Sequence, residues 1–359
     1  MTTKTVLIMA GGTGGHVFPA LAVADCLKAK NITVVWLGTR QGIEAKLVVE
    51  AGYDIRWLSI SGLRGKNKWS LVLAPFKLFF ACLQALRVII EVKPAAVLGM
   101  GGFASGPGGL MAFLTARPLL VHEQNAIPGM TNTLLAKMAG VVMEAFPKTF
   151  KPSDKVHLVG NPVRENIAKI KPPAERLKSR GNRLKILVVG GSLGAAALNE
   201  AVPAMLSLSD NQQKYEVWHQ AGSKNIATTQ AIYSEFNLDA RVDAFIDNMA
   251  DAYEWADVVI CRAGAMTVSE LAMAGMASIL IPYPYAVDDH QTANAGFLVK
   301  NNAAILIPQT ELSAERLSQE LVALTDEKIM KMSVAAQNIA TPSAAQKAAE
   351  LCMLAGGLK

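Results

Sequence analysis

Short apolar runs rich in β-branched residues recur along the chain, separated by longer stretches in which apolar residues follow helical spacing. The runs predict buried parallel strands, because strands that are covered on both faces lack polar alternation. They span residues 6–9, 34–37, 96–98, 119–121, 185–189, 217–219, 258–260 and 278–281. Helices are predicted between them, for example over residues 18–28 and 198–208. This alternation indicates an α/β fold with parallel sheets.

The order strand, glycine loop, helix opens each half of the chain. Residues 7–15 and 186–194 share this pattern, and a helix rich in alanine and leucine follows each. Glycine and proline in the segment Gly160-Asn161-Pro162-Val163-Arg164 interrupt the pattern between the halves. We therefore expect domains over residues 1–160 and 161–340, with an alanine-rich helix in 341–359 that packs back on the first domain.

Composition and charge are consistent with two packed domains. A chain of 359 residues exceeds what one hydrophobic core usually organises, and 51% hydrophobic against 18% charged residues is typical of globular proteins. Four dispersed cysteines without C-x-x-C spacing argue against a zinc site or disulfide framework and fit a reducing cytoplasm. The first half is basic and the second mildly acidic, which suggests that the first half meets an anionic surface or substrate. An ordinary solvated surface is the alternative.

Three glycine loops carry the first candidate chemistry, at residues 11–15, 99–106 and 190–194. Glycines let the backbone approach a ligand closely, and N–H groups at a following helix start attract anions. None of the loops is a Walker A motif, which disfavours nucleoside triphosphate hydrolysis. The second strand ends Trp36-Leu37-Gly38-Thr39-Arg40 without the carboxylate that a nicotinamide enzyme uses for the ribose, which disfavours a dehydrogenase. Tight helix–strand packing is the alternative for any one loop, but hardly for three.

A second candidate site follows the strand at 258–260. The segment Cys261-Arg262-Ala263-Gly264-Ala265-Met266-Thr267-Val268-Ser269-Glu270 would open a helix at Ala265 or Thr267. Glu270 would then lie in the first turns, where a carboxylate can accept both hydroxyls of a ribose while the helix start faces a pyrophosphate. A plain capping box from Thr267 to Glu270 is the alternative.

Eight motifs together resemble one family, in that family's order and over nearly the whole chain. They are Gly11-Gly12-Thr13-Gly14-Gly15-His16, Ile60-Ser61-Gly62-Leu63-Arg64-Gly65, Gly99-Met100-Gly101-Gly102, His122-Glu123-Gln124-Asn125, the segment 160–164, the loop 190–194, the segment 262–270 and Asp289-His290-Gln291-Thr292-Ala293-Asn294-Ala295. The chain resembles the MurG family, the bacterial N-acetylglucosaminyltransferases of peptidoglycan synthesis.

The resemblance implies a GT-B fold of two Rossmann-like domains with parallel sheets facing across a cleft. It also implies an inverting transfer of GlcNAc from UDP-GlcNAc to the muramyl-pentapeptide of undecaprenyl-pyrophosphate lipid I, which forms lipid II. Another GT-B enzyme, a sugar-nucleotide epimerase of related fold, or a non-catalytic nucleotide-binding protein of the division machinery remain alternatives.

The resemblance also assigns substrate contacts, mainly on the second half for the donor. The backbone at Ile246 would read the uracil and Glu270 the ribose; Gln291 and Asn125 would contact the GlcNAc. The pyrophosphate would lie on Ser192, Arg164 and the helix start formed by Ala265, Met266, Thr267, Val268 and Ser269. Thr13, Gly14 and Gly15 would line the cleft, and Gly101 and Gly102 would face the pyrophosphate of the acceptor. Whether His290 touches the sugar stays open.

An inverting transfer needs a general base, and two residues are candidates. His16 follows the first glycine loop at a helix N-terminus, with capping or loop anchoring as its alternative role. Glu123 is carried into a loop by the strand at 119–121. Ala126 stands where the second histidine of H-E-x-x-H would be, so a zincin site is excluded. Without any Asp-x-Asp motif we expect no metal and no other cofactor, and helix N-termini with Arg164 would stabilise the diphosphate.

The most apolar stretch, residues 71–90, contains Pro75, Lys77, Gln84 and Arg87, which argues against a membrane span. Its apolar residues cover more than one helical stripe and are interspersed with cations, which suits the surface of an anionic bilayer. The residues expected at that surface are Lys68, Trp69, Phe76, Lys77, Phe79 and Phe80. A fully buried core helix is the alternative.

These expectations define partners and a location. The partners are UDP-GlcNAc, lipid I, an anionic membrane surface and other proteins of cell-wall synthesis or division; no nucleic-acid motif is present. The apolar run at 6–10 ends in glycines, unlike a signal peptide. The expected location is therefore peripheral, at the cytoplasmic face of the bacterial inner membrane, with roles in cell shape and the cell cycle.

Overall fold

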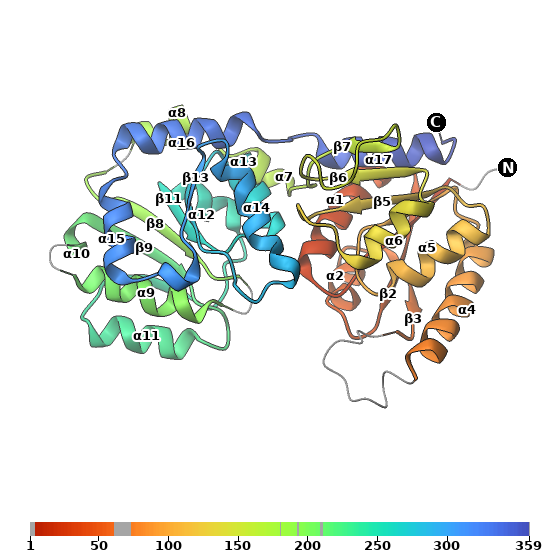
Figure 1. The fold of residues 1–359 in the computed structure, drawn as a ribbon, viewed down its shortest axis with the longest axis horizontal. Helices are drawn as coiled ribbons and strands as arrows, with labels where there is room; N and C mark the ends of the chain where they lie inside the picture. The colour runs from red at the N-terminus through yellow and green to blue at the C-terminus, as the bar shows by residue number, and fades with distance from the viewer. Residues whose placement is uncertain (1–3, 61–72, 180, 192–193, 209–210, 359) are drawn as a thin grey trace. The chain divides into compact units, whose positions relative to one another are not determined.

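A computed structural model of the chain describes residues 4–60, 73–179, 181–191, 194–208 and 211–358 (Figure 1). The chain forms two compact units. Unit 1 comprises Met1–Arg164 and Thr341–Lys359, and unit 2 comprises Glu165–Ala340. The division therefore falls just after the Gly-Asn-Pro segment, and the chain returns to unit 1 at its C-terminal end.

Unit 1 is built on a parallel seven-stranded sheet with the order β3-β2-β1-β4-β5-β6-β7. Its strands are β1 (Thr5–Met9), β2 (Thr33–Thr39), β3 (Asp54–Leu58), β4 (Ala96–Gly99), β5 (Leu119–Glu123), β6 (Val141–Glu144) and β7 (Val156–Leu158). β1 is central: Leu7 is in register with Val35 of β2 and Val97 of β4. The strand order reverses at β1 and β4, which is where ligands bind in doubly wound folds.

Two helix layers cover this sheet. Residues of α1 (Gly14–Ala29), α2 (Glu44–Glu50) and α17 (Ala344–Ala355) share one core cluster with Ile8 and Leu98. Residues of α4 (Ala74–Val92), α5 (Ser105–Leu114) and α6 (Met130–Met138) share another with Leu7 and Val97. Alternate residues of the central strands thus face opposite layers, as a parallel sheet buried on both faces requires.

Unit 2 repeats the plan with a parallel six-stranded sheet of order β10-β9-β8-β11-β12-β13. Its strands are β8 (Leu184–Val189), β9 (Tyr215–Gln220), β10 (Arg241–Asp243), β11 (Val258–Cys261), β12 (Ala277–Leu280) and β13 (Ala304–Leu306). Its helices are α7 (Glu165–Ala168), α8 (Pro173–Arg176), η1 (Leu177–Ser179), α9 (Ala196–Ser207), α10 (Asn211–Lys214), α11 (Ile226–Glu235), α12 (Met249–Trp255), α13 (Ala265–Met273), η2 (Val287–Asp289), α14 (His290–Val299), η3 (Gln309–Glu311), α15 (Ala314–Val322) and α16 (Asp326–Asn338). The glycine loops at 11–15 and 190–194 therefore follow the equivalent first strand of each unit.

All eight strands predicted from apolar runs are confirmed, within a few residues at their ends. The prediction missed β3, β6, β7, β10 and β13. β3 alternates exposed Asp54 with partly buried Ile55, as an edge strand does, and β7, β10 and β13 are only three residues long. Such strands bury too little apolar surface to leave a run in the sequence.

Helix α4 contradicts the alternative that residues 71–90 form a fully buried core helix. It buries one stripe, formed by Ala81, Ala85, Val88 and Ile89. The side chains of Phe76, Phe79 and Phe80 are 63%, 59% and 60% exposed. Within the part of the chain that the structure describes, no helix is both long enough and apolar enough to cross a bilayer.

Candidate active site

The first glycine loop follows β1 at the carboxyl edge of the unit 1 sheet. Gly12 has a positive φ of 87°, so the backbone turns there in a conformation that side chains rarely adopt. Helix α1 then begins at Gly14, with Thr13 as an N-cap whose side chain makes no capping bond. His16 lies in the first turn, half-buried, and its Nδ1 is 3.1 Å from the carbonyl oxygen of Gly11.

The loop after β4 lies directly against the first loop. Gly101 and Gly102 have φ values of 99° and 86°. A Cβ at Gly102 would overlap the Gly11 carbonyl, and one at Gly101 would stand 2.8 Å from Cδ2 and Nε2 of His16. The structure therefore brings together Thr13, Gly14, Gly15 and His16 with Gly101 and Gly102, as the sequence predicted for one side of the site.

A buried carboxyl group, which the sequence reasoning missed, lies beneath this loop. Glu44, at the start of α2, reaches back to Thr39, the last residue of β2. Its Oε1 accepts hydrogen bonds from the backbone N–H and the hydroxyl of Thr39. Its Oε2 accepts one from the Gly12 N–H. Residues 36–40 themselves hold no carboxylate, and the Glu44 carboxyl group is fully buried and bonded within the protein.

Glu123 ends β5 and is 2% exposed. Its Oε1 accepts hydrogen bonds from the backbone N–H and side-chain amide of Asn125, and its Oε2 from the Gly129 N–H and the Asn132 amide. Both oxygens therefore hold the loop that leads to α6. Asn125, a predicted sugar contact, is positioned by this network.

Arg164 lies at the end of the first segment of unit 1. Its guanidinium carbon stands 4.8 Å from the ring centroid of Phe18, on α1 one turn beyond the glycine loop. This cation–π contact keeps the cation beside the N-terminal part of α1. The segment before Arg164 is held by the buried His122, whose Nε2 bonds the Gly160 carbonyl. Burial lowers the pKa of the His122 imidazole.

In unit 2, α13 begins at Ala265 with Gly264 as its N-cap. Thr267 is inside the helix, so the alternative of a capping box from Thr267 to Glu270 is wrong. The first turn presents backbone N–H groups that have no acceptor four residues earlier in the helix, as an anion site requires. Glu270 is 7% exposed, and its Oε2 accepts a hydrogen bond of 3.2 Å from the hydroxyl of Tyr253.

Gln291 lies on the first turn of α14. Its Oε1 accepts hydrogen bonds from the backbone N–H groups of Ala263 and Tyr283, at 3.2 and 2.9 Å. Because both partners are donors, they fix the amide orientation and direct the Nε2 donor elsewhere. Asn294, one turn further on, is completely buried and donates to the Ala263 carbonyl. The sequence reasoning assigned Asn294 no role.

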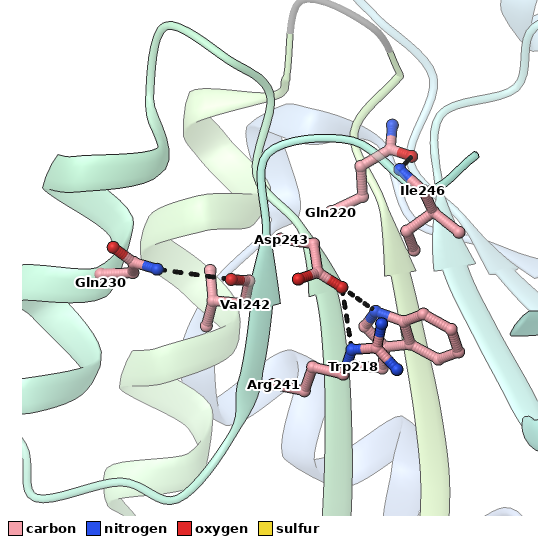
Figure 2. Close-up of polar contacts among 7 residues, drawn as sticks. All are labelled: Trp218, Gln220, Gln230, Arg241, Val242, Asp243 and Ile246. Carbon is pink, nitrogen blue, oxygen red and sulfur yellow. Dashed lines mark hydrogen bonds and ion pairs between the residues drawn. The ribbon is translucent and has the colours of Figure 1, made fainter.

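The predicted uracil contact, Ile246, follows β10. Figure 2 shows its backbone N–H donating to Oε1 of Gln220, the last residue of β9. Gln220 Nε2 donates to the carbonyl of Gly191, in the glycine loop after β8. One side chain thus ties two predicted donor-binding segments together, and the neighbouring Phe245 is 52% exposed. No sequence pattern marks Gln220, because its hydrogen-bond partners are distant in the chain.

Three predicted residues lie outside the described residues: Ser192, Lys68 and Trp69. Among the described residues, no group of three or more His, Cys, Asp or Glu side chains could hold a metal. Two cavities, of about 390 and 370 Å³, lie near the starts of strands: one beside Trp218 and Arg241 in unit 2, the other beside Arg117 and Leu119 in unit 1. Neither includes a predicted site residue.

Comparison with known proteins defines the class. The model of the glycosyltransferase family 28 N-terminal domain matches residues 6–144, and that of the family 28 C-terminal domain matches residues 185–351. These ranges include the first glycine loop of each unit. The chain is built as a family 28 glycosyltransferase of the GT-B fold.

Similar proteins narrow the class further. A curated relative from Nitrosococcus oceani is 53% identical, covering 97% of this chain and 98% of the relative, and one from Nitrosospira multiformis is 50% identical, covering 98% of each. Both are named UDP-N-acetylglucosamine–N-acetylmuramyl-(pentapeptide) pyrophosphoryl-undecaprenol N-acetylglucosamine transferase. The crystal structure of Acinetobacter baumannii MurG is 42% identical, with a TM-score of 0.85 over 98% of this chain and 99% of that one. The chain belongs to the MurG family.

Other solved structures share the fold alone. A UDP-GlcNAc 2-epimerase from Neisseria meningitidis, bound to UDP-GlcNAc, has a TM-score of 0.68 at 14% identity, covering 96% of this chain and 98% of that one. The two-domain fold therefore does not by itself distinguish transfer from epimerisation.

Proposed function

We propose that the protein transfers GlcNAc from UDP-GlcNAc to the muramyl-pentapeptide of undecaprenyl-pyrophosphate lipid I, with inversion, to form lipid II. The observation that carries this proposal is the 53% identity, over 97% of the chain, to an enzyme named for that transfer. The paired glycine loops and the helix N-terminus of α13 support it chemically, because both substrates carry a pyrophosphate.

Unit 2 is the proposed donor side. Glu270 binds the ribose hydroxyls, and the backbone N–H groups at the start of α13 bind the diphosphate. The Nε2 of Gln291 faces the sugar, since its Oε1 is already bonded to two backbone groups. The uracil binds at the Ile246 backbone, whose N–H donates to Oε1 of Gln220. Ser192 belongs to the same proposal as a diphosphate contact.

His16 is the proposed general base, and Glu123 is not. The four hydrogen bonds to Glu123 leave its carboxyl group as an anchor for the loop that leads to α6. His16 stands where the glycine loops at 11–15 and 99–106 meet. In the proposed step the acceptor hydroxyl attacks the anomeric carbon, its proton passes to Nε2 of His16, and the bond to the UDP oxygen breaks. Arg164 and the α13 N-terminus stabilise the departing diphosphate.

Unit 1 is the proposed acceptor side and rests on the membrane surface. Gly101 and Gly102 lie in the loop that would face the lipid pyrophosphate. The helices α4, α5 and α6 lie side by side (Figure 1), and exposed Phe79, Phe80, Phe113 and Leu134 belong to them. Exposed Lys77 lies among the aromatics of α4. Aromatic side chains with nearby cations favour an anionic bilayer, each cation contributing about 1 kcal/mol. We propose a peripheral location at the cytoplasmic face of the inner membrane.

Incubation with UDP-GlcNAc and a lipid I analogue tests this function. Formation of a lipid II product with a β-linked GlcNAc supports it. Release of UDP or of an epimerised sugar without any lipid product would instead favour an epimerase or another GT-B enzyme. Donor binding without turnover on any acceptor would indicate a non-catalytic protein.

A further inference from the structure

Glu44 is a fully buried acidic side chain for which the proposed reaction has no direct use. Three glycines make room for it: a Cβ at Gly11, Gly38 or Gly42 would collide with its side chain. In the described part of the chain no cation pairs with it. Burial of an unpaired carboxylate is costly unless hydrogen bonds compensate, so its position calls for a physical reason.

Its hydrogen bonds divide between two segments. Oε1 accepts from the N–H and hydroxyl of Thr39, at 3.0 and 2.7 Å, which anchors the carboxylate to the end of β2. Oε2 accepts from the Gly12 N–H at 3.0 Å, which connects it to the first glycine loop. The carboxylate therefore links the end of a core strand to the first glycine loop. Without this link the glycines would leave the loop backbone conformationally adaptable.

The peptide group between Gly11 and Gly12 also contacts the His16 imidazole. The Gly12 N–H and the Gly11 carbonyl belong to one planar trans peptide group, so they point in opposite directions. The carbonyl lies 3.1 Å from Nδ1 of His16. A carbonyl can only accept, so Nδ1 carries the proton and Nε2 carries the lone pair. No hydrogen bond to Nε2 is made within the described residues.

We propose that Glu44 is a positioning residue that acts through the Gly11–Gly12 peptide group to keep His16 in the tautomer with its proton on Nδ1. The carboxylate fixes the orientation of the peptide group and, by bonding its N–H, strengthens the carbonyl as an acceptor. Nε2 is then presented to the acceptor hydroxyl without any rearrangement. This arrangement does through one peptide group what a carboxylate bonded directly to a histidine does in a catalytic triad.

The proposal rests on the proposed function, in which His16 is the base, but its first test does not need activity. Long-range ¹H–¹⁵N NMR spectra of the full chain, labelled at its five histidines, read the tautomer of each ring. The His16 signal is assigned with His16→Gln. We expect the Nδ1–H tautomer in the native chain. A proton on Nε2 would overturn the proposal, and this outcome is measured even if no Glu44 variant folds.

Two variants then separate positioning from a loss of stability. Glu44→Gln keeps the shape but cannot accept from both Gly12 and Thr39. Thr39→Val removes one hydrogen bond to the same carboxylate and leaves the Gly12 bond in place. We expect a mixture of His16 tautomers and a fall in kcat of at least about tenfold for Glu44→Gln, with KM for UDP-GlcNAc within about twofold. Thr39→Val should keep the native tautomer and kcat.

The outcomes are distinguishable from failure of the proposed function. Equal effects of the two variants on kcat, or an unchanged His16 tautomer in folded Glu44→Gln, would overturn the positioning role. If the native chain formed no lipid II product, the proposed function would fail while the NMR spectra still decided whether Glu44 sets the tautomer.

Discussion

The buried carboxyl groups of Glu44, Glu123 and Glu270 have different surroundings, which favour a structural role for some and a binding role for another. Glu123 accepts four hydrogen bonds from its own loop, and Glu44 accepts three from a strand end and a glycine loop. Glu270 instead lies on the second turn of a helix whose N-terminus is preceded by glycine. In the proposed function only Glu270 of these three contacts a ligand, near a positive helix end, so its substitution should weaken donor binding.

Glu270→Gln should weaken the binding of UDP-GlcNAc by tenfold or more, because hydrogen bonds to a charged group contribute about 1.5–3 kcal/mol. At saturating donor kcat should change little, since ribose contacts are made equally in the ground and transition states. Calorimetric titration measures the Kd. Glu254→Gln, an exposed carboxylate on α12, is the matched control. Equal affinity of the two variants would remove Glu270 from the donor site.

His219 predicts how the stability depends on pH. Its Nε2 lies 3.0 Å from Oδ1 of Asn199, an acceptor, and its Nδ1 lies 2.9 Å from the Tyr233 hydroxyl. Burial lowers the pKa of His219 from 6.5 to about 3. Above pH 6.5 the imidazole is neutral in both states. Below it the unfolded chain takes up a proton that the folded chain resists, so the free energy of unfolding falls as the pH drops towards 3.

Urea unfolding at pH 7.5 and 5.0 measures this contribution. From pH 7.5 to 5.0 the free energy of unfolding of the native chain should fall by about 2 kcal/mol more than that of His219→Gln. Burial also lowers the pKa of His122. His122 is present in both proteins, so its contribution cancels in the comparison. The same pH dependence in both would show that His219 is protonated in the folded state.

Residues of the site were predictable where they lie in contiguous motifs. The loops containing Thr13 and Gly101 and the helix start at Ala265 could be read from strand, glycine and helix order. Glu44 and Gln220 could not, because each acts on segments that only the tertiary fold brings near. The capping-box alternative at Thr267 failed for a local reason: Gly264 already caps the helix.

Among the elements, helix α4 exposes large apolar side chains that a helix packed only in the core would bury. Its buried stripe is formed by alanine, valine and isoleucine, while its large aromatics point outward. Phe79 and Phe80 contact each other edge to face, with centroids 5.9 Å apart. A surface of this kind is costly in water and favourable in a bilayer interface.

The double substitution of Phe79 and Phe80 by serine should reduce partitioning onto anionic vesicles by more than tenfold, since each buried aromatic contributes about 1.5–3 kcal/mol. Co-sedimentation with phosphatidylglycerol vesicles measures the bound fraction. Phe236→Ser removes an aromatic of unit 2 that is 40% exposed and should leave binding unchanged. Unchanged binding of the double variant, or its unfolding, would count against a membrane role for α4.

Apolar residues in the sequence predict buried strands well, but they do not decide whether a helix such as α4 is covered. Continuous apolar runs identify strands covered on both faces, such as β1 and β8. They do not identify short edge strands such as β10, which gain most of their stability from pairing. For α4 the periodicity indicated excess apolar surface, but only the packed structure distinguishes a helix that is covered from one that is not.

At the scale of the whole molecule, the chain completes unit 1 last. Helix α17 packs against α1, and Ala344, Ala348, Ala349 and Cys352 belong to the unit 1 core. The core of unit 1 is therefore completed by a segment that follows unit 2 in the chain. Alanines at the contact allow the two helices to approach closely.

Ala348→Asp should destabilise unit 1 by several kcal/mol, because it buries a carboxylate without a partner. Gln346→Asp places the same residue on the exposed side of α17 and should change stability little. Thermal unfolding monitored by calorimetry, with and without UDP, distinguishes the units, since the nucleotide should stabilise unit 2 alone. An undisturbed first unit in Ala348→Asp would mean that α17 contributes nothing to its core.

The two units share one fold and one type of glycine loop, yet their proposed tasks differ. In the proposed function, unit 2 binds the UDP donor through α13, Glu270 and Gln291. Unit 1 carries the proposed base, His16, and is the proposed side for the lipid acceptor. The equivalence of the sheets is therefore one of architecture, and the side chains added after each first strand make the difference.

The kinetics of His16→Ala test this division most directly. Transfer from UDP-GlcNAc to a lipid I analogue and the Kd for UDP-GlcNAc should be measured on the same preparation. If His16 is the base, His16→Ala should lower the rate of transfer at least about a hundredfold while the donor Kd stays within about twofold of the native value. An unchanged rate of transfer, or a loss confined to donor affinity, would contradict this role of His16.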